Sequence, residues 1–157
     1  AVASAFDGDW DLCIFDVGGD AAGAMSLGRY HTDFAALEDG QLEVYDIVNV
    51  FRPMSESPEK ILRLKEEMEG FARLEVTGFV NNSNLLNYAS ADDIRRGYEV
   101  LRETSDMSGI PVAHTTGRRE FLEEFLRDGR DAKYIGEPIG LETYMHRSWE
   151  AFTNLGL

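Results

Sequence analysis

Residues that could do chemistry stand at the ends of apolar runs in this 157-residue sequence. The first run, residues 12–17, holds Asp16 near its end and leads into Gly18, Gly19 and Asp20. An aspartate there can hold Mg²⁺ through a water beside a nucleotide phosphate, and a glycine three residues later lets a backbone N–H approach that phosphate. Asp16 and Gly19 have this D-x-x-G spacing. The pattern is short and frequent by chance, so the alternative is a turn aspartate that caps the following helix.

The same stretch does not contain a complete phosphate loop. Gly18 and Gly23 have the G-x-x-x-x-G spacing, but Ala24 and Met25 stand where the loop needs Lys and Ser or Thr. Asp20 likewise stands where the dinucleotide fingerprint G-x-G-x-x-G needs its second glycine. The residues therefore fit the acidic side of a nucleotide site, opposite the loop that grips the phosphates.

Polar residues also follow the other apolar runs. Arg52, just before Pro53, could reach a phosphate or pair with an acidic neighbour. Residues 81–84, Asn-Asn-Ser-Asn, offer donors and acceptors that suit the edge of adenine, although an Asn-rich turn is the alternative. His114 is more often a satisfied histidine of a core or sheet edge than a ligand. Arg118 opens a predicted helix, against the dipole preference, which indicates either a nearby anion or a solvent-facing charge.

Four apolar runs predict the strands that position these residues, at 12–17, 42–50, 74–80 and 110–114. The second and third are nearly continuous, as in parallel strands covered on both faces. Helical patterns separate them: one over residues 24–37, one after the cap Ser57-Pro58, one after the capping box at Ser90, and one from Thr116 or Gly117. We therefore predict one α/β domain over residues 1–157, a doubly wound, mostly parallel sheet with helices on both faces. Ligands bind such sheets at the carboxyl ends of the strands.

The composition of the chain disfavours several classes of binding partner. The formal net charge of −14 disfavours nucleic acid or an anionic membrane, although backbone N–H groups can still bind a small anion. Cys13 is the only cysteine, so neither a disulfide nor a cysteine metal cluster can form within one chain, and we expect it to be buried. No second His or Cys accompanies the candidate residues, so a transition-metal site is not expected. No apolar run reaches membrane-spanning length, and the cytoplasm is the expected location.

Taken in order, these strand ends resemble one family. The chain is similar to the carboxyl-terminal two-thirds of a P-loop ATPase of the MinD/ParA/nitrogenase-iron-protein class. Over roughly residues 10–120 it looks like uncharacterised bacterial ATP-binding proteins of that class. The stretch FDVGGDAAG resembles the Walker B and switch II segment, and GFVNNSN resembles the strand that ends in an adenine-contacting Asn. IPVAHTTGRREF resembles the next strand and the loop that closes over the base.

The resemblance implies a P-loop NTPase-like fold and an ATP-binding, ATP-hydrolysing switch that uses Mg²⁺ and closes as a homodimer. Asp16 would position Mg²⁺ through water, Gly19 would sense the γ-phosphate, and Asp20 would begin a moving switch segment. The nucleotide-binding residues that it implies are Asn82, Ser83, Arg52, Thr116, Gly117 and Arg118.

The sequence departs from this family in two ways. The Walker A loop of the first strand–helix unit is not present in these residues, so we expect it upstream in a longer parent chain. Residues 21–24, Ala-Ala-Gly-Ala, lack the switch cysteine of the nitrogenase iron protein, so no iron–sulfur role is implied. Two other functions stay open: a non-catalytic binding or scaffold domain with a degenerate nucleotide site, and an unrelated flavodoxin-like or transferase domain that uses the same sheet edge.

Overall fold

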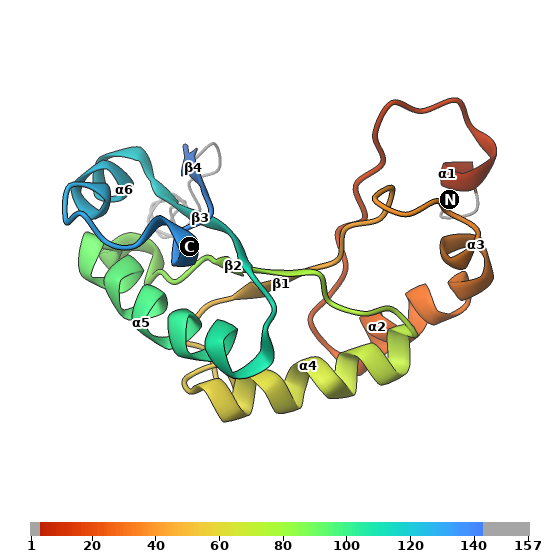
Figure 1. Ribbon diagram of the computed structural model, residues 1–157, viewed down its shortest axis with the longest axis horizontal. Coiled ribbons are helices and arrows are strands. Elements are labelled where there is room, and N and C mark those ends of the chain that lie inside the picture. Colours follow the sequence, from red (N-terminus) through yellow and green to blue (C-terminus); the bar gives the residue numbers. More distant parts are fainter. Residues whose placement is uncertain (1–3, 143–157) are drawn as a thin grey trace, which may run out of the picture.

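The computed structural model describes residues 4–142 as an α/β fold (Figure 1). The strands are β1 (Tyr45–Val48), β2 (Gly78–Asn81), β3 (Val112–Arg118) and β4 (Glu137–Leu141). The α-helices are α1 (Ser4–Asp7), α2 (Ala21–Gly28), α3 (His31–Ala35), α4 (Pro58–Ala72), α5 (Ala91–Ser108) and α6 (Arg119–Leu126). Two short 3₁₀ turns, η1 (Leu86–Tyr88) and η2 (Ala132–Tyr134), follow β2 and α6. None of the helices in this described range is both long and apolar enough to cross a bilayer.

The four strands form one parallel sheet in the order β1-β2-β3-β4, so spatial order follows chain order. Ile47 lies opposite Val80, and Asn81 lies opposite Thr115. This pairing aligns the carboxyl ends of β1 and β2 with the middle of the longer β3. The predicted parallel α/β sheet is therefore confirmed.

Helices α4, α5 and α6 share one face of this sheet. Val48, Phe79 and Val112 of the strands pack with Ile61 of α4 and Leu101 of α5 in one buried cluster. On β3, a methyl group added at Gly117 would meet side chains of both α5 and α6, which places those two helices on the same side. Sequential parallel strands joined by right-handed crossovers produce this result, because each crossover returns over the same face.

The expected covering of both faces is therefore wrong for the described residues. Side chains alternate along a strand, so Tyr45 and Ile47 point away from the face that carries Val48. Ile47 is 58% exposed and Tyr45 is 36% exposed. A doubly wound sheet would need helices from a chain segment that runs back across β1 in the opposite direction.

The predicted helix starts at Ser57 and Ser90 are confirmed. Ser57 is the N-cap of α4 with Pro58 in its first turn, and Ser90 forms a reciprocal capping box with Asp93 at the start of α5. The predicted helix over residues 24–37 is divided into α2 and α3. Helix α2 packs on α4, and its last residue, Gly28, lies so close that a methyl group there would be 2.4 Å from the Phe71 carbonyl oxygen.

The predicted strand at residues 12–17 is wrong, because this segment pairs with no neighbour in the sheet. Phe15 instead packs against Phe6 and Phe34 in an aromatic cluster, with ring centroids 6.1 Å and 5.5 Å away. Leu12 and Ile14 are exposed at 76% and 83%. Cys13, expected to be buried, is exposed as well.

Two further differences from the predicted elements lie at the β3 and β4 side of the sheet. Strand β3 runs on through Arg118, so α6 begins at Arg119 and not at Thr116 or Gly117. Strand β4 was not among the predicted strands, and its Pro138 is tolerated because β4 is an edge strand of the described sheet.

Candidate functional site

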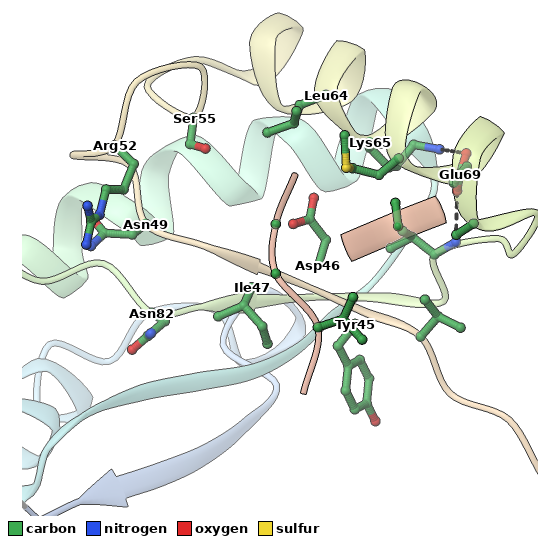
Figure 2. Close-up of a pocket in the computed structure, with 18 of the residues that line it drawn as sticks. Tyr45, Asp46, Ile47, Asn49, Arg52, Ser55, Leu64, Lys65, Glu69 and Asn82 are labelled. Atoms are coloured by element: carbon green, nitrogen blue, oxygen red, sulfur yellow. Dashed lines mark hydrogen bonds and ion pairs between the residues drawn. The ribbon is translucent and has the colours of Figure 1, made fainter. Parts of the chain in front are cut away.

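A cavity of about 830 Å³ extends from the outer edge of β1 to the carboxyl ends of β1 and β2 (Figure 2). Its walls come from the turn before α2 and α2 itself, from strand β1 with its following loop, from one face of α4 with the segment after it, and from the loop after β2. The polar residues that line it are Asp46, Asn49, Arg52, Ser55, Lys65, Glu69, Asn82 and Asn84. Two glycines, Gly18 and Gly19, line it from the opposite wall.

The turn before α2 brings backbone to this cavity, but it does not bring the predicted magnesium ligand. Gly18 and Gly19 line the cavity, and a methyl group at Gly19 would meet nothing within 4 Å, so its backbone is open. Asp20 caps α2, since its Oδ1 accepts a 2.8 Å hydrogen bond from the Gly23 N–H. Asp16 is exposed and does not line the cavity. An aspartate that caps the next helix was the alternative interpretation of this stretch, and Asp20 is the residue that does so.

Three asparagines at the carboxyl ends of β1 and β2 are joined by hydrogen bonds. Asn49 donates through Nδ2 to the Asn84 carbonyl oxygen at 3.0 Å, and Asn84 donates through Nδ2 to the Asn82 carbonyl oxygen at 2.9 Å. Thr116 donates from its hydroxyl to Asn82 Oδ1 at 2.8 Å. The Asn82 Nδ2 group makes no hydrogen bond within residues 4–142, so it is the amide donor that this group of asparagines leaves for a ligand.

A buried layer beneath them fixes the loop after β2. Asn81 donates through Nδ2 to the Ile94 carbonyl oxygen of α5 at 3.1 Å, while its Oδ1 accepts from the Ser83 N–H at 3.2 Å. The Ser83 hydroxyl accepts from the Val50 N–H at 3.3 Å. Gly97 of α5 allows this contact, because a methyl group there would lie 2.1 Å from Asn81 Oδ1. Ser83, predicted to bind nucleotide, is 1% exposed and serves this layer.

Cationic side chains lie around the same sheet edge. Arg52 is exposed and lines the cavity, and its guanidinium makes no hydrogen bond or ion pair in the described part of the chain. The Arg96 guanidinium lies 5.5 Å from the centroid of the Phe51 ring. Arg118 donates to the Leu86 carbonyl oxygen at 3.5 Å. Leu86 itself has φ of 55°, a left-handed conformation that costs a non-glycine residue free energy.

The predicted site residues on β3 do not line the cavity. Thr116 acts through its hydrogen bond to Asn82, and Gly117 lies against Ile94 of α5. Arg118 reaches only the backbone of the loop after β2. The structure thus brings Gly19, Arg52 and Asn82 to one cavity, whereas the predicted β3 residues lie outside its lining.

Three charged residues of the cavity were not among the predicted site residues. Asp46 lies inside β1 and points into the cavity, near Lys65 of α4 (Figure 2). Lys65 Nζ pairs with Glu69 Oε2 at 2.7 Å, and Glu69 Oε1 accepts from the Val76 N–H at 2.8 Å. Burial raises the pKa of Asp46 to about 6, with Glu69 adding to the rise and Lys65 opposing it. An acid inside the apolar run Val-Tyr-Asp-Ile-Val was the sequence signal that could have identified this residue.

The arrangement is suited to binding a polar small molecule at one end and apolar groups along β1. Asn82 and Arg52 supply donors, and the glycine turn supplies open backbone. Among the described residues, no cluster of three His, Cys, Asp or Glu side chains could hold a metal ion. In comparisons with protein-family models, curated proteins and solved structures, nothing matches this chain.

Proposed function

We propose that these residues form the carboxyl-terminal part of an ATP-binding and ATP-hydrolysing switch of the MinD/ParA class that acts in the cytoplasm as a homodimer. The observation that carries the proposal is the meeting of Gly18 and Gly19 with Arg52 and Asn82 in one cavity at the carboxyl ends of parallel strands. That edge is where open α/β sheets bind nucleotides. Three separate segments of the sequence supply these residues.

Different cavity residues bind different parts of an adenine nucleotide. Asn82 Nδ2 donates to the base, while Thr116 holds the amide in place by donating to Oδ1 at 2.8 Å. Arg52 reaches a phosphate, since its guanidinium pairs with nothing else in the described range. Gly18 and Gly19 allow close approach of backbone to the same anion. The bound ATP supplies a phosphoanhydride bond whose hydrolysis changes the conformation of the switch.

The magnesium part of the proposal rests on Asp16 alone. Its carboxylate is exposed and lies outside the cavity lining, so the arrangement described here provides no direct ligand. Asp16 would act only through a bound water. A Walker A segment is also required for the β- and γ-phosphates, and the 157 residues contain no G-x-x-x-x-G-K-[ST] stretch. We propose that the natural polypeptide supplies it from outside these residues.

The test is ATP binding to the natural gene product that carries these residues, with Asn82→Asp as the variant. This change removes the Nδ2 donor to the base but keeps an oxygen for Thr116, and it adds a negative charge to the site of an anionic ligand. We expect a loss of ATP affinity of at least about fivefold, since one hydrogen bond to the ligand is worth about 1 kcal/mol or more. Gln41→Glu, the same chemical change at an exposed residue outside the cavity lining, should leave affinity unchanged.

Absence of ATP binding by the natural gene product, or equal affinity of Asn82→Asp and the unchanged protein, would contradict the proposal. Turnover provides a separate check of Asp16. Asp16→Asn should abolish Mg²⁺-dependent hydrolysis while leaving the fold intact, as circular dichroism would show. Unchanged turnover would remove Asp16 from the site.

A specific observation favours a second function, a non-catalytic binding or scaffold domain. Asn49 and Asn84 already use their side chains within the protein, and Ser83 is fully buried. Most of the asparagine-rich edge is therefore structural. Binding of ATP by the natural gene product without any hydrolysis would support this second function over the first.

A further inference from the structure

Asn82 is the residue of the asparagine-rich edge that keeps a free polar group. Its backbone N–H donates to the Val48 carbonyl oxygen at 2.9 Å, and its carbonyl oxygen accepts from Asn84 Nδ2 at 2.9 Å. The side chains of Asn49 and Asn84 are each bonded at both ends within the protein. Of these three asparagines, only Asn82 therefore has an unused side-chain donor among residues 4–142, and it lines the cavity.

Thr116 sets which end of this amide is free. Its hydroxyl oxygen lies 2.8 Å from Asn82 Oδ1 and 3.3 Å from the Asn81 carbonyl oxygen. A hydroxyl carries one proton, which goes to the shorter contact, and Asn81 is already paired with β3 in the sheet. The carbonyl end of the Asn82 amide is therefore held by Thr116. Its NH₂ group and the second lone pair of Oδ1 are left for a ligand.

The orientation of such an amide decides which purine it can pair with. Adenine carries an amino donor next to a ring nitrogen that accepts, whereas guanine carries a carbonyl acceptor next to a ring N–H that donates. An asparagine amide offers one donor and one acceptor side by side, so it can pair with either base, but only in opposite orientations. An amide held in one orientation pairs with one purine and places like groups against the other.

The neighbouring cavity residues contribute binding without this distinction. Leu85 and Leu86 offer apolar surface, and every purine has a face that packs on such surface. In the proposed function, Arg52 and the glycine turn contact phosphates, which ATP and GTP share. Discrimination between the purines thus depends on the Asn82 amide and on the hydroxyl that orients it.

We infer that Thr116 is a positioning residue for nucleotide selection: it holds the Asn82 amide in the orientation that pairs with adenine and thereby excludes guanine. This inference rests on the proposed ATP-binding function, which supplies the choice of adenine. Thr116 lies outside the cavity lining and acts through Asn82 rather than by contact with the base.

The test is equilibrium binding of ATP and of GTP to the natural gene product and to its Thr116 variants. We expect the unchanged protein to bind ATP at least about tenfold more tightly than GTP, as is typical of a two-bond amide contact with a base. Thr116→Val keeps the shape of the side chain but removes the hydroxyl, so the amide can rotate to suit either base. The two affinities should then come within about threefold of each other, and Thr116→Ala should behave in the same way. Thr116→Ser, which retains the hydroxyl, should keep the preference for ATP.

The ratio of the two affinities separates positioning from a purely structural role. A loss of stability lowers the folded fraction of a variant and weakens the binding of both nucleotides by the same factor, so the ratio does not change. Thr104→Val is the matched control, because it removes a hydroxyl that donates at 2.8 Å to the Val100 carbonyl oxygen within α5, outside the cavity lining. This variant should keep the ATP preference of the unchanged protein.

Four outcomes would overturn the inference. An unchanged ratio in Thr116→Val would show that the hydroxyl does not orient the amide. Loss of the preference in Thr116→Ser or in Thr104→Val would assign the effect to packing. Equal affinities or a preference for GTP in the unchanged protein would contradict the selection of adenine. Binding of neither nucleotide would overturn the proposed function together with this inference, whereas ATP still binds when the inference alone fails through the Thr116 variants.

Discussion

Replacement of Asp46 by Asn should change how the stability of the 157-residue chain depends on pH. Burial raises the pKa of Asp46 from 3.8 to about 6, with the neighbours Glu69 and Lys65 acting in opposite directions. The folded chain therefore binds more protons than the unfolded chain between about pH 4 and pH 6, and its stability rises as the pH falls through that range. Since one pKa unit corresponds to about 1.4 kcal/mol, the full effect is roughly 3 kcal/mol.

The assay is urea unfolding at pH 7 and pH 4 for the unchanged chain, Asp46→Asn and the control Asp39→Asn, an exposed turn residue. Relative to Asp46→Asn, the unchanged chain should gain up to roughly 3 kcal/mol between pH 7 and pH 4. Asp39→Asn should retain the pH dependence of the unchanged chain. If Asp46→Asn shows that same pH dependence, the carboxylate is not held in a desolvated position, and our reasoning about this cavity wall is refuted.

Three further predictions concern the packing and the charges of the sheet edge. Gly97→Ala puts a methyl group 2.1 Å from Asn81 Oδ1 and should lower the free energy of unfolding by about 1–3 kcal/mol. Gly70→Ala, in an open part of α4, should raise the free energy of unfolding by about 0.5–1 kcal/mol. Urea unfolding measures both changes. Thr116→Val removes a 2.8 Å hydrogen bond and should cost about 1 kcal/mol in the same assay, and a gain in stability would contradict the role we assign to it. Arg95 holds the pKa of Asp128 at about 2, so the stability that this pair provides is present above about pH 4 and is lost as the pH falls toward 2. Asp128→Asn should remove that part of the acid transition, followed by circular dichroism.

Local sequence signals predicted three of the four described strands and two of the longest helices. Runs of continuous apolar residues identify strands of a parallel sheet, and Ser57 and Ser90 identify helix starts through hydrogen bonds within one turn. Of the predicted site residues, only Gly19, Arg52 and Asn82 line the cavity, and Arg52 and Asn82 each follow a predicted strand. These signals come from residues close together in the sequence. The structure confirms the strands and helices whose stabilising contacts are also close in the sequence.

The features that were wrong depend on partners distant in the sequence. The run 12–17 has strand-forming residues, but a strand exists only where a neighbour offers hydrogen bonds, and Phe15 packs instead in an aromatic cluster. Strand β4 contains Pro138 and Gly140 and no apolar run, so only its pairing with β3 reveals it. Asp46 was missed because its position at a cavity is set by α4 and the turn before α2.

The match between chain order and strand order has a consequence for biosynthesis. As the polypeptide leaves the ribosome, each new strand–helix unit can dock on the strand made just before it, so the sheet grows in one direction from β1 to β4. Contacts between consecutive units close short loops, which favours rapid assembly of the sheet. None of the strands synthesised after β1 pairs with its outer edge, because all of them lie on its other side. The sheet edge that borders the cavity is therefore made first, and growth of the sheet toward β4 adds no strand to it.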